Sequence, residues 1–592
     1  MSDPRPATLQ EQLLRARSFP GTGLRFVDGA ERERFEPWRA IASRAAAVAG
    51  RLRAAGVEPG ERVALIYPTG PDFFDAFFGT LLAGAVPVPL YPPVRLGRLE
   101  EYHERTAAML GAAGAVLVLV DRRIGGLSGV AVERARPRLG GTTIDRLPEA
   151  PPLERLGAAD DLALVQFSSG TTVEPKPVAL TQRAILAQVA ALNALWPDTP
   201  ERTQSGVSWL PLYHDMGLIG CVFPALERPA VLTLLPPERF VARPALWLRA
   251  LARHRATISV APNFAYALAA ERVRDEELEG CDLSEWRVAL CGAETISAAT
   301  LRAFAGRFAP WGFRAEALTP VYGLSEAALA VTFSPLGRSF ASRRFDREAL
   351  SRDARAAPDD AGVELVSVGR PLPGFTLELR DGAGRPVGEG RLGRIFVSGP
   401  SLMREYLGRP EATASALVDG WLDTGDLGFV ADGELFLTGR AKDVLILRGR
   451  NHAPGEVEAA IDGVVGVRRG CAAAVSRRAE GEATDRLLLF VERRGTRRPD
   501  GGADDELAGR LRAAVLAGTG LAVDEIHLLE PGTLPRTSSG KIRRGETLAR
   551  HLADRLQAPA PAGRASLFGA WLAGRRALAR ARRAARRSGS AR

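Results

Sequence analysis

A strand, a hydroxyl-rich loop and a second apolar run follow one another in Asp161-Leu-Ala-Leu-Val-Gln-Phe167, Ser168-Ser-Gly-Thr-Thr-Val-Glu-Pro-Lys176 and Pro177-Val-Ala-Leu-Thr181. The first run is mainly apolar, which indicates a buried strand, and we expect the last run to open a helix. The hydroxyls and backbone N–H groups of the loop suit a phosphate, and Lys176 adds a positive charge. This is not a Walker loop, because Gly540-Lys541, the one Gly-Lys pair of the chain, is followed by Ile542 instead of serine or threonine.

Around this stretch, the first 440 residues alternate strand-like apolar runs with helical ones. Residues 62–67 predict a strand, residues 72–82 a helix and residues 85–90 another strand. Such alternation is typical of βαβ units with largely parallel sheets. We therefore expect an α/β fold with a large N-terminal domain over residues 1–441. Within it, residues 338–361 are polar and weakly patterned, which indicates an insertion or a long loop.

The character of the chain changes after Arg440, where shorter elements begin. The expected elements are strands at residues 444–447 and 487–491 and a helix at residues 454–461. We predict a small α+β C-terminal domain over residues 442–556. Residues 557–592 then form a Pro- and Ala-rich linker, of semi-rigid composition, and a basic tail.

The net charge is concentrated in that tail. Of the 592 residues, 79 are basic and 69 acidic, but residues 564–592 hold nine arginines and no acid. The rest of the chain is nearly neutral, so we expect no nucleic-acid partner, which would need basic folded domains. Leu567, Phe568, Trp571 and Leu572 fall on one helical stripe, which makes the tail a candidate for peripheral membrane contact. A frayed terminus or a contact with an acidic protein surface is the alternative.

The remaining composition is that of a folded globular protein, with 46% hydrophobic and 25% charged residues. The cysteines Cys221, Cys281, Cys291 and Cys471 lie far apart, so neither a disulfide framework nor a zinc cluster is predicted. The N-terminus lacks the apolar core of a signal peptide. The longest uncharged run, residues 76–94, contains four prolines that would break a membrane-spanning helix. We expect a cytoplasmic protein, with the tail as a candidate peripheral membrane contact.

Lysine is rare in this chain. Only Lys176, Lys442 and Lys541 occur among the 79 basic residues. A coding bias toward arginine explains the general pattern. Under that bias, a surviving lysine marks a place where a compact ammonium is needed instead of a planar guanidinium.

Two further motifs have the residue types of a nucleotide site. Tyr322-Gly-Leu-Ser-Glu326 is preceded by Cys291-Gly-Ala-Glu294, which ends a strand. An aromatic ring beside glycines can cover a purine, and a glutamate can hold Mg²⁺ together with phosphate oxygens. Taken alone, Glu326 would equally fit a surface carboxylate at the start of a helix.

Two more motifs lie toward the C-terminus. They are Trp421-Leu-Asp-Thr-Gly-Asp426 with Gly439-Arg440-Ala-Lys442-Asp443, and Pro535-Arg-Thr-Ser-Ser-Gly-Lys541-Ile-Arg-Arg544. Asp426 can accept hydrogen bonds from both hydroxyls of a ribose, although a solvated turn aspartate is the simpler interpretation. Glycine and serines flank Lys541, as expected for a charge that a loop delivers to a site.

Together and in this order, these motifs resemble the adenylate-forming, AMP-binding superfamily of acyl-CoA synthetases, peptide-synthetase adenylation domains and luciferases. Three stretches are similar to its fatty acyl-AMP ligases: Ser208-Trp-Leu-Pro-Leu-Tyr-His-Asp-Met-Gly-Leu-Ile-Gly220, Ala261-Pro-Asn-Phe-Ala-Tyr266 and Ile446-Leu-Arg-Gly-Arg-Asn-His452. The resemblance covers about residues 10–550. The polar residues 338–361 lie where that family carries an insertion.

The resemblance implies a two-step reaction that uses ATP and Mg²⁺. A fatty acid and ATP give an acyl-adenylate and pyrophosphate. The acyl group then passes to the phosphopantetheine thiol of an acyl carrier protein, or of a carrier domain in a polyketide or peptide synthase, instead of to free CoA. The small domain would be a mobile lid that rotates between the two steps.

The resemblance also implies roles for individual residues. The ATP phosphates would be held by Ser168, Ser169, Gly170, Thr171, Thr172 and Lys176. The rest of the nucleotide site would comprise Gly292, Ala293, Glu294, Tyr322, Gly323, Asp426 and Arg440, with Tyr322 on adenine and Asp426 and Arg440 at the ribose. The predicted catalytic residues are Lys541, which would bridge the carboxylate and the α-phosphate, Glu326, which would bind Mg²⁺, and His214. His214 would shape the carboxylate end of the acyl tunnel, and Lys442 would be the hinge.

The chain departs from the superfamily pattern at Val173 and Pro177, where glycines are usual. Pro177 keeps Lys176 out of the α region, so we expect a stiffer phosphate loop. Two other functions remain open: a long-chain acyl-CoA ligase, which shares every nucleotide motif, and a non-catalytic lipid- or membrane-binding homologue, against which Lys541 and Asp426 argue. An amino-acid adenylation domain is disfavoured, because residues 213–215 and 263–266 offer no obvious acid dedicated to an α-ammonium group.

Overall fold

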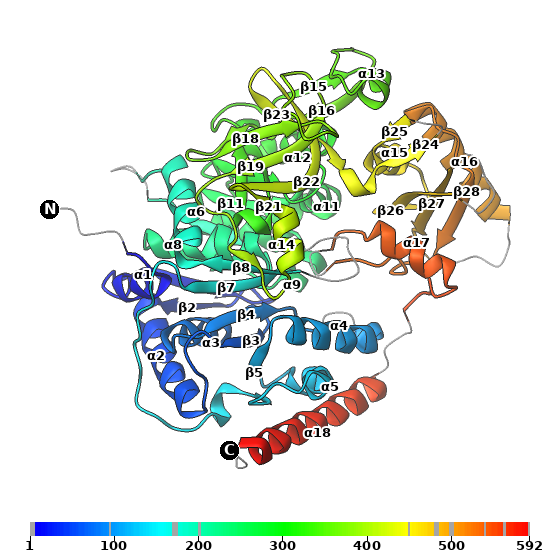
Figure 1. Ribbon diagram of the computed structural model, residues 1–592. Coiled ribbons are helices and arrows are strands. Elements are labelled where there is room, and N and C mark those ends of the chain that lie inside the picture. Colours follow the sequence, from blue (N-terminus) through cyan, green and yellow to red (C-terminus); the bar gives the residue numbers. More distant parts are fainter. Residues whose placement is uncertain are drawn as a thin grey trace.

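The computed structural model describes residues 6–93, 96–168, 176–198, 203–447, 450–478, 485–495, 502–537, 540–559 and 564–589. Strands and helices alternate over the first 440 residues, and a smaller set of elements follows them (Figure 1). This arrangement confirms the α/β fold with a small C-terminal domain that the sequence predicts.

A sheet of nine strands forms the centre of the N-terminal part. Its strands lie in the order β17-β14-β13-β12-β11-β9-β10-β1-β2. Neighbours from β13 to β1 pair in parallel, whereas β2, β14 and β17 add antiparallel strands at the edges. The bounds are β1 Gly23–Val27, β2 Glu33–Pro37, β9 Gly206–Ser208, β10 Val231–Leu234, β11 Ile258–Pro262, β12 Val288–Gly292, β13 Leu318–Gly323, β14 Ala330–Phe333 and β17 Arg370–Pro371. Because the central strands are parallel, their carboxyl ends share one edge of the sheet.

A second, parallel sheet has the order β4-β3-β5-β6 and lies below the first in Figure 1. The bounds are β3 Arg62–Ile66, β4 Val86–Leu90, β5 Ala115–Val120 and β6 Gly141–Thr142. Helix α3 (Pro71–Leu82) connects β3 to β4, and α4 (Leu99–Ala112) connects β4 to β5. Proline at the first position of α3 starts the helix without losing a needed N–H group. The βαβ pattern expected from residues 62–90 is confirmed.

The third sheet contains the strand next to the phosphate loop and corrects one expectation. Its order is β20-β8-β7, with bounds β7 Leu162–Phe167, β8 Pro177–Thr181 and β20 Glu405–Tyr406. The prediction that residues 177–181 open a helix was wrong, because they pair antiparallel with β7 and with β20. Pairing along the whole strand with β7, and at two positions with β20, overrides the local pattern. The helix, α6 (Gln182–Leu195), starts at the next residue, where the Thr181 hydroxyl accepts a hydrogen bond from the Ala184 N–H at 3.1 Å.

The expected insertion contains regular structure. Residues 338–361 hold β15 (Ser342–Phe345), which pairs with β16 (Val363–Val366), and helix α13 (Arg347–Arg352). The ring of Phe345 packs against Phe429 and Phe436, at centroid distances of 4.8 and 5.5 Å. These contacts attach the insertion to an antiparallel sheet with bounds β18 Thr376–Arg380, β19 Gly393–Ser398, β21 Leu417–Val418, β22 Trp421–Ala431 and β23 Glu434–Arg440.

The C-terminal domain follows the 3-10 turn Ala441–Asp443. Its bounds are β24 Leu445–Leu447, β25 Arg450–His452, α15 Pro454–Ile461, β26 Val467–Arg477, β27 Arg486–Arg493, α16 Gly502–Thr519, β28 Glu525–Leu529 and α17 Arg544–Leu552. The elements expected at residues 444–447, 454–461 and 487–491 are confirmed. Along β27, alternate side chains enter two different buried clusters, so both faces of this strand are covered.

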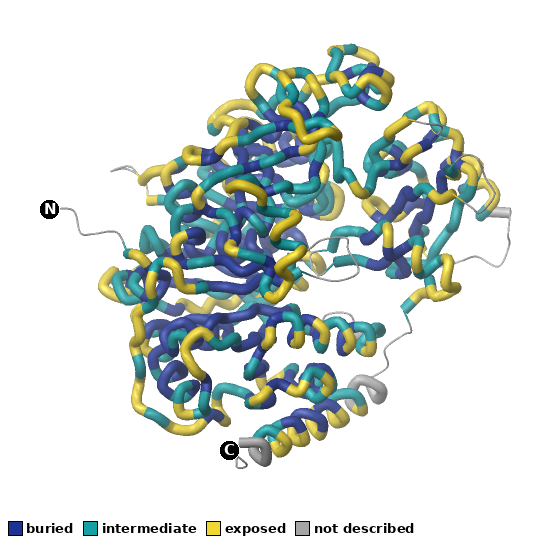
Figure 2. Tube along the Cα trace, viewed as in Figure 1, coloured by how far each residue is buried: buried dark blue, intermediate teal, exposed yellow. Residues whose placement is uncertain are grey.

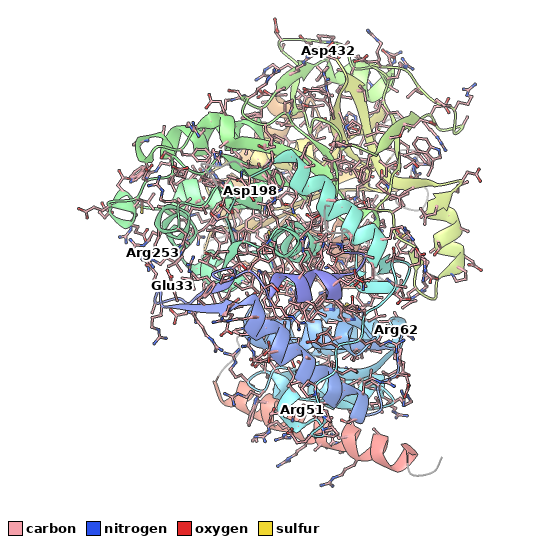
Figure 3. All side chains as sticks on the ribbon, turned by 90° about the vertical axis from the view of Figure 1, so that its left-hand side faces the viewer. Glu33, Arg51, Arg62, Asp198, Arg253 and Asp432 are labelled. Atoms are coloured by element: carbon pink, nitrogen blue, oxygen red, sulfur yellow. The ribbon has the colours of Figure 1, made fainter. Side chains whose placement is uncertain are left out.

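Helices surround the sheets of the N-terminal part. The bounds not given elsewhere are α1 Leu9–Ala16, α2 Trp38–Ala54, α7 Asp215–Gly217, α8 Phe223–Glu227, α9 Pro237–Ala242, α10 Ala245–Arg253, α11 Asn263–Arg272, α12 Ala298–Phe308 and α14 Pro410–Ala416. Burial is concentrated in the strands and in the helix faces that cover them (Figure 2). Ion pairs such as Arg253 with Glu33, at 3.3 Å, lie on the outside (Figure 3). In the described part of the chain, no helix combines the length and the apolar character that crossing a membrane requires.

The basic tail forms helix α18 (Arg564–Gly589), which packs along α5 (Gly125–Ala135) (Figures 1 and 3). The two backbones approach closely, because a Cβ atom on Gly574 would lie 1.6 Å from the carbonyl oxygen of Gly126. Ala577 and Leu578 are buried, and Leu578 joins the core of the parallel sheet. The tail is therefore part of the folded N-terminal structure.

This docking changes the interpretation of the predicted membrane-binding stripe. Trp571 packs against Gly126, whose Cβ position would be 2.4 Å from the indole ring. Leu572 is 36% exposed, and the side chains of Leu567 and Phe568 lie outside the described residues. The helix was correctly expected, but its buried face contacts α5 and is not available to a lipid surface.

Candidate active site

A pocket lies at the carboxyl edge of the nine-stranded sheet. It has about 870 Å³ of empty space, part of which is open to solvent. The strands β11, β12 and β13 contribute lining residues near their carboxyl ends, which is where parallel α/β sheets place their ligand sites. The predicted site residues that line it are Ser168, His214, Gly292, Ala293, Tyr322, Gly323, Glu326, Arg440 and Lys541. Residues spread over more than 370 positions of the sequence therefore surround one cavity.

Lys541 reaches this pocket from the C-terminal domain. Its loop is closed by the Thr537 N–H, which donates to the Lys541 carbonyl at 2.8 Å. Burial, reinforced by the positive charge of Arg440, lowers the pKa of the Lys541 ammonium. A cation in this state gains stability when an anion enters the pocket beside it. The position of Lys541 thus suits a negatively charged ligand.

Three side chains form a hydrogen-bonded group at one wall of the pocket. The Tyr322 hydroxyl donates to Asp426 Oδ2 at 2.7 Å, and Arg440 Nε lies 3.2 Å from Asp426 Oδ1. The register that pairs Asp426 on β22 with Arg440 on β23 brings the carboxylate and the guanidinium together. The carboxylate is 8% exposed and fixes the orientation of the Tyr322 ring.

Glu326 lies in the short turn that follows β13. Its Oε1 accepts a hydrogen bond from the Tyr406 hydroxyl at 2.9 Å, and burial raises the pKa of the Glu326 carboxyl. The Lys176 ammonium lies 4.5 Å from the centre of the Tyr406 ring, so Tyr406 connects the base of the phosphate loop to Glu326. A cation close to Glu326 would favour the ionised carboxylate and reverse this shift.

These charges define what the polar half of the pocket can bind. Burial destabilises the ionised forms of both Lys541 and Glu326, because no neighbouring group fully compensates either charge. A ligand that carries phosphates toward Lys541 and a divalent cation toward Glu326 would compensate both charges. The arrangement therefore fits a metal-bound polyphosphate.

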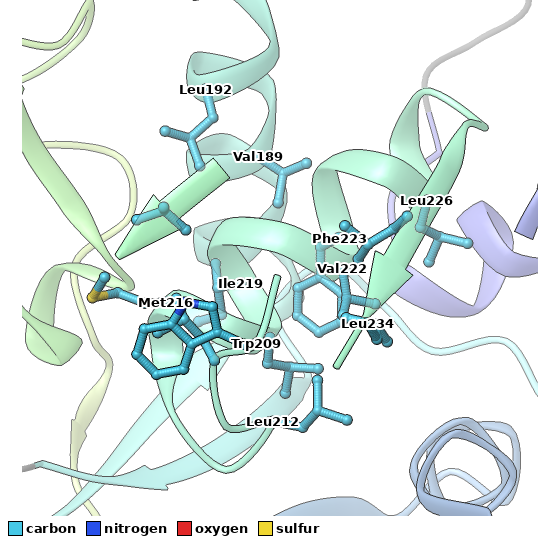
Figure 4. Close-up of a cluster of buried hydrophobic side chains, with 14 of the residues drawn as sticks. Val189, Leu192, Trp209, Leu212, Met216, Ile219, Val222, Phe223, Leu226 and Leu234 are labelled. Carbon is cyan, nitrogen blue, oxygen red and sulfur yellow. The ribbon is translucent and has the colours of Figure 1, made fainter. Parts of the chain in front are cut away.

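The other half of the pocket is apolar. Its walls are formed by Leu192, Trp196, Met216, Val260, Leu290, Val321, Leu329, Ala330 and Phe333. Trp196 and Phe333 are in contact, with ring centroids 6.0 Å apart. Leu192 and Met216 belong to the buried cluster drawn in Figure 4, so this wall is continuous with the protein core. An aliphatic chain is the kind of ligand that such walls accept.

The remaining predicted residues are placed differently. The carboxylate of Glu294 accepts a hydrogen bond from the Phe264 N–H at 2.6 Å, at the start of α11, and does not line the pocket. Lys176 also lies outside the lining, and Lys442 is exposed in the turn that joins the two domains. The predicted phosphate contacts of Ser169, Gly170, Thr171 and Thr172 lie outside the described residues.

Sequence reasoning missed three side chains at the site. Asp215 and Ser325 line the pocket and bond to each other, and Tyr406 binds Glu326. Asp215 and Ser325 stood inside motifs that had already been recognised, so they could have been assigned. Tyr406 has no local signal, because only the pairing of β20 with β8 brings it to Glu326.

A second group of metal-type donors lies in the C-terminal domain. One donor atom each from Glu525, His527 and His551 lies within 4.8 Å of the others. The ring of His527 is stacked on Phe490 at 4.7 Å and packs against His551 at 4.3 Å. Because the His527 ring is stacked on Phe490 and the His551 ring packs against it at a tilt of 52°, we interpret this group as packing.

Comparisons with known proteins agree on one family. The model of the AMP-binding enzymes matches residues 26–407. A Caulobacter vibrioides protein, provisionally named as an acyl-CoA synthetase, is 38% identical over 87% of this chain and 90% of its own. The long-chain-fatty-acid–AMP ligase FadD26 of Mycobacterium tuberculosis is 34% identical over 93% of this chain and 97% of its own.

A solved structure gives the same result for the fold. It comes from a study of fatty acyl-adenylate ligases of E. coli and L. pneumophila, with 34% identity and a TM-score of 0.86. The match covers 92% of this chain and 98% of that one. The similarity therefore includes both the N-terminal sheets and the C-terminal domain.

Proposed function

The chain belongs to the AMP-binding enzymes and, within this adenylate-forming superfamily, to the fatty acyl-AMP ligases, and from this membership we propose its reaction. It activates a fatty acid with ATP to an acyl-adenylate. It then transfers the acyl group to the phosphopantetheine thiol of a carrier protein or carrier domain. The first step is the common chemistry of the family. The second step is specific to the acceptor, which we propose is a carrier thiol.

One observation carries the proposal: a single cavity joins an apolar half to a charged half. The apolar half contains Trp196 and Phe333, and the charged half contains Glu326, Arg440 and Lys541. A fatty acid and a metal-bound nucleotide are the two ligands that these halves suit. Their junction is where a carboxylate and a phosphate would meet.

In the first step, a carboxylate oxygen of the fatty acid attacks the α-phosphorus of ATP. An oxygen–phosphorus bond forms, the bond between the α- and β-phosphates breaks, and pyrophosphate leaves with the bonding electrons. We propose that Lys541 stabilises the negative charge as it shifts from the carboxylate to the α-phosphate. The Tyr322 ring covers the adenine, and Asp426 and Arg440 bind the ribose.

Ser168, Ser169, Gly170, Thr171, Thr172 and Lys176 are assigned to the phosphates, and Gly292, Ala293 and Gly323 to the wall around the nucleotide. Ala293 has a φ of +69°, a conformation that is rare outside glycine and frequent at functional sites.

The side chains of the site fit a magnesium ion. Glu326 keeps one carboxylate oxygen free of the Tyr406 hydroxyl, and Mg²⁺ commonly binds through a single carboxylate together with substrate phosphates. Bound there, the ion would neutralise the charge on the leaving pyrophosphate. Glu326 is the residue that would hold it.

In the second step, the thiol sulfur of the carrier attacks the acyl carbonyl. A sulfur–carbon bond forms, the carbon–oxygen bond to phosphate breaks, and AMP leaves while the thiol proton passes to solvent. The C-terminal domain, over residues 442–556, rotates about Lys442 to admit the thiol. Lys442 is exposed in a short turn, where a few φ and ψ changes meet little packing resistance.

The insertion is positioned to restrict that rotation. Glu348 forms an ion pair with Arg450 at 3.1 Å, and Arg347 donates a hydrogen bond to the carbonyl of Gly518. Both contacts join α13 to the C-terminal domain. We therefore expect acyl-adenylate to accumulate when the enzyme is given a fatty acid, ATP and micromolar CoA, and acyl-carrier product to form when a phosphopantetheinylated carrier is supplied. Mass spectrometry of the products from a panel of fatty acids measures both outcomes.

The competing function is an acyl-CoA ligase, which the name of the Caulobacter relative favours. Rapid formation of CoA thioester at micromolar CoA would support it against the carrier-dependent reaction. An Arg347→Ala variant should loosen the insertion and raise CoA thioester formation. Arg338→Ala is the matched control, because it removes an exposed arginine from the same insertion.

A further inference from the structure

A buried carboxylate holds the predicted catalytic histidine. Asp215 Oδ1 lies 2.6 Å from His214 Nδ1 and accepts a hydrogen bond from the Met216 N–H at 2.7 Å. Its second oxygen, Oδ2, accepts a hydrogen bond from the Ser325 hydroxyl at 2.5 Å. Asp215 and Ser325 are 6% and 8% exposed. The carboxylate is thus fixed between the start of α7 and the turn after β13.

The direction of these bonds decides which nitrogen of His214 is left for a ligand. Burial alone would raise the pKa of Asp215, but His214 and the donors from Ser325 and Met216 outweigh it and lower that pKa to about 2. An ionised carboxylate only accepts, so His214 Nδ1 must carry the proton. The opposite nitrogen, Nε2, is buried and has no hydrogen-bond partner in the described part of the chain.

We infer that Asp215 and Ser325 are positioning residues, which fix the His214 imidazole so that Nε2 faces the reacting carboxylate and α-phosphate. The inference rests on the proposed adenylation reaction. A buried nitrogen without a partner is costly, and an oxygen of the reacting groups would supply one. An accepting carboxylate that is itself held in one orientation, as Asp215 is by Ser325, limits the imidazole to one tautomer and one ring position.

The tautomer provides a test that does not depend on activity. In the full chain labelled with ¹⁵N-histidine, the imidazole ¹⁵N shifts of His214 should show protonated Nδ1, and Asp215→Asn should remove that signature. A His214→Gln variant identifies the signal among the six histidines. A wild-type protein in which neutral His214 is protonated at Nε2 would overturn the inference, whatever reaction the enzyme catalyses.

Kinetics provide the second test. Asp215→Asn should lower kcat for acyl-AMP formation by about tenfold or more while KM for ATP changes by less than about twofold. Ser325→Ala should have a smaller effect that Ser325→Thr reverses. In a His214→Ala background, Asp215→Asn should cost little more, because the group that it positions is gone. Additive losses in the double variant would assign Asp215 a purely structural role, and a wild-type enzyme without acyl-AMP formation would instead reject the proposed function.

A different observation concerns how the C-terminal domain is attached. It is joined to the N-terminal part at Ala441–Asp443, and its other end leads into α18, which docks on α5 of the N-terminal part. Arg580 reinforces the docking through an ion pair with Glu133 at 2.5 Å. The segment between Leu552 and Arg564 can span at most about 40 Å when fully extended. The domain is therefore tethered at both ends.

Contacts near this second attachment hold the domain in the pose that places Lys541 in the pocket. Arg105 pairs with Glu546 of α17 at 2.5 Å, and Glu101 pairs with Arg550 at 2.9 Å. Arg98 donates hydrogen bonds to three carbonyl oxygens on either side of α17. On the N-terminal side, the residues that make these contacts, Arg98, Glu101 and Arg105, lie on or next to α4, in the same subdomain as α5.

We propose that docked α18 is an intramolecular tether that favours the adenylation pose and slows the acyl-transfer step. Rotation of the C-terminal domain must either stay within the reach of the segment after α17 or pull α18 from α5. This second proposal rests on the two-step reaction above. It assigns the basic tail to control of domain movement instead of to a membrane.

Two glycines of α18 give a matched test. A Cβ atom on Gly574 would meet the backbone of α5, whereas no atom of the described residues lies within 4 Å of the Cβ position of Gly569. Both positions are helical, so leucine at either one raises helix propensity to a similar extent. Gly574→Leu should undock α18, and a chain that ends at Gln557 lacks the helix and so removes the tether, while Gly569→Leu should behave as wild type.

Single-turnover transfer from acyl-AMP to the carrier should become about fivefold faster in the undocked proteins, with acyl-AMP formation unchanged. Small-angle X-ray scattering should show a broader distribution of domain positions, which needs no reaction. Unchanged scattering in both undocked proteins would overturn the tether. Salt-sensitive binding of the full chain, but not of the shortened one, to anionic vesicles with unchanged scattering would assign the helix to a membrane instead.

Discussion

We expect Lys541→Ala to lower the rate of acyl-AMP formation by about 10²- to 10³-fold, which corresponds to about 2.7 to 4 kcal/mol of transition-state stabilisation. Lys541 lines the pocket, and its charge is poorly compensated until an anion enters. Removing Lys541 takes away the positive charge that stabilises the negative charge as it shifts from the carboxylate to the α-phosphate. Pyrophosphate release, measured with saturating fatty acid and ATP, reports the effect.

The conservative variant and the stability of the protein serve as controls. Lys541→Arg should not restore the rate, because a planar guanidinium does not reproduce the geometry of a point charge. Thermal unfolding of both variants should match that of the wild type, since Lys541 lies on a loop. Near-normal pyrophosphate release by Lys541→Ala would remove it from the catalytic assignment.

We expect Asp426→Ala to raise KM for ATP by about 10- to 100-fold, because charge-assisted hydrogen bonds to the ribose are each worth about 1.5 to 3 kcal/mol. The same substitution frees the Tyr322 hydroxyl and removes the carboxylate partner of Arg440. The free energy of unfolding should fall by about 1 to 2 kcal/mol, because the buried Tyr322 hydroxyl and the partly exposed Arg440 guanidinium lose their partner. Steady-state kinetics and urea unfolding measure the two effects separately.

Asp160→Ala is the matched control for Asp426→Ala. It also removes a carboxylate from an arginine, but the ion pair of Asp160 with Arg183 is solvent-exposed. Exposed pairs contribute about 0 to 1 kcal/mol, so both KM for ATP and stability should stay close to wild type. Equal losses in the two variants would mean that Asp426 contributes only to the overall charge of the protein and is not part of the nucleotide site.

The success and the failure of sequence reasoning around β8 have the same physical origin. The β7 strand and the βαβ units of residues 62–90 were predictable, because hydrophobic periodicity over a short window reports local structure. Residues 177–181 also follow a local apolar pattern, but a short apolar run fits a buried strand as well as a helix, and the pairing with β7 decides for the strand. Tyr406 was hidden for a different reason, because β20 lies more than 200 residues from β8 in the sequence.

The tail shows the limit of an amphipathic pattern. An apolar stripe beside arginines indicates that a helix has one face to bury, and α18 is indeed a helix. The pattern does not identify what covers that face. Close approach at Gly574 and Gly126 decides it in favour of α5, because only small residues allow two helix backbones to come so near.

By itself, the sequence determined the α/β class, the order of most elements and the motifs that mark a nucleotide-binding, adenylate-forming family, because these depend on local periodicity and on residue types at short spacings. The tertiary structure alone decided that Ser168, Tyr322 and Lys541 surround one cavity, that Asp215 and Ser325 hold His214, and that α18 returns to the N-terminal part. Each of these facts is a contact between segments that are distant in the chain. Such contacts depend on strand order and helix packing over the whole molecule, which no local pattern contains.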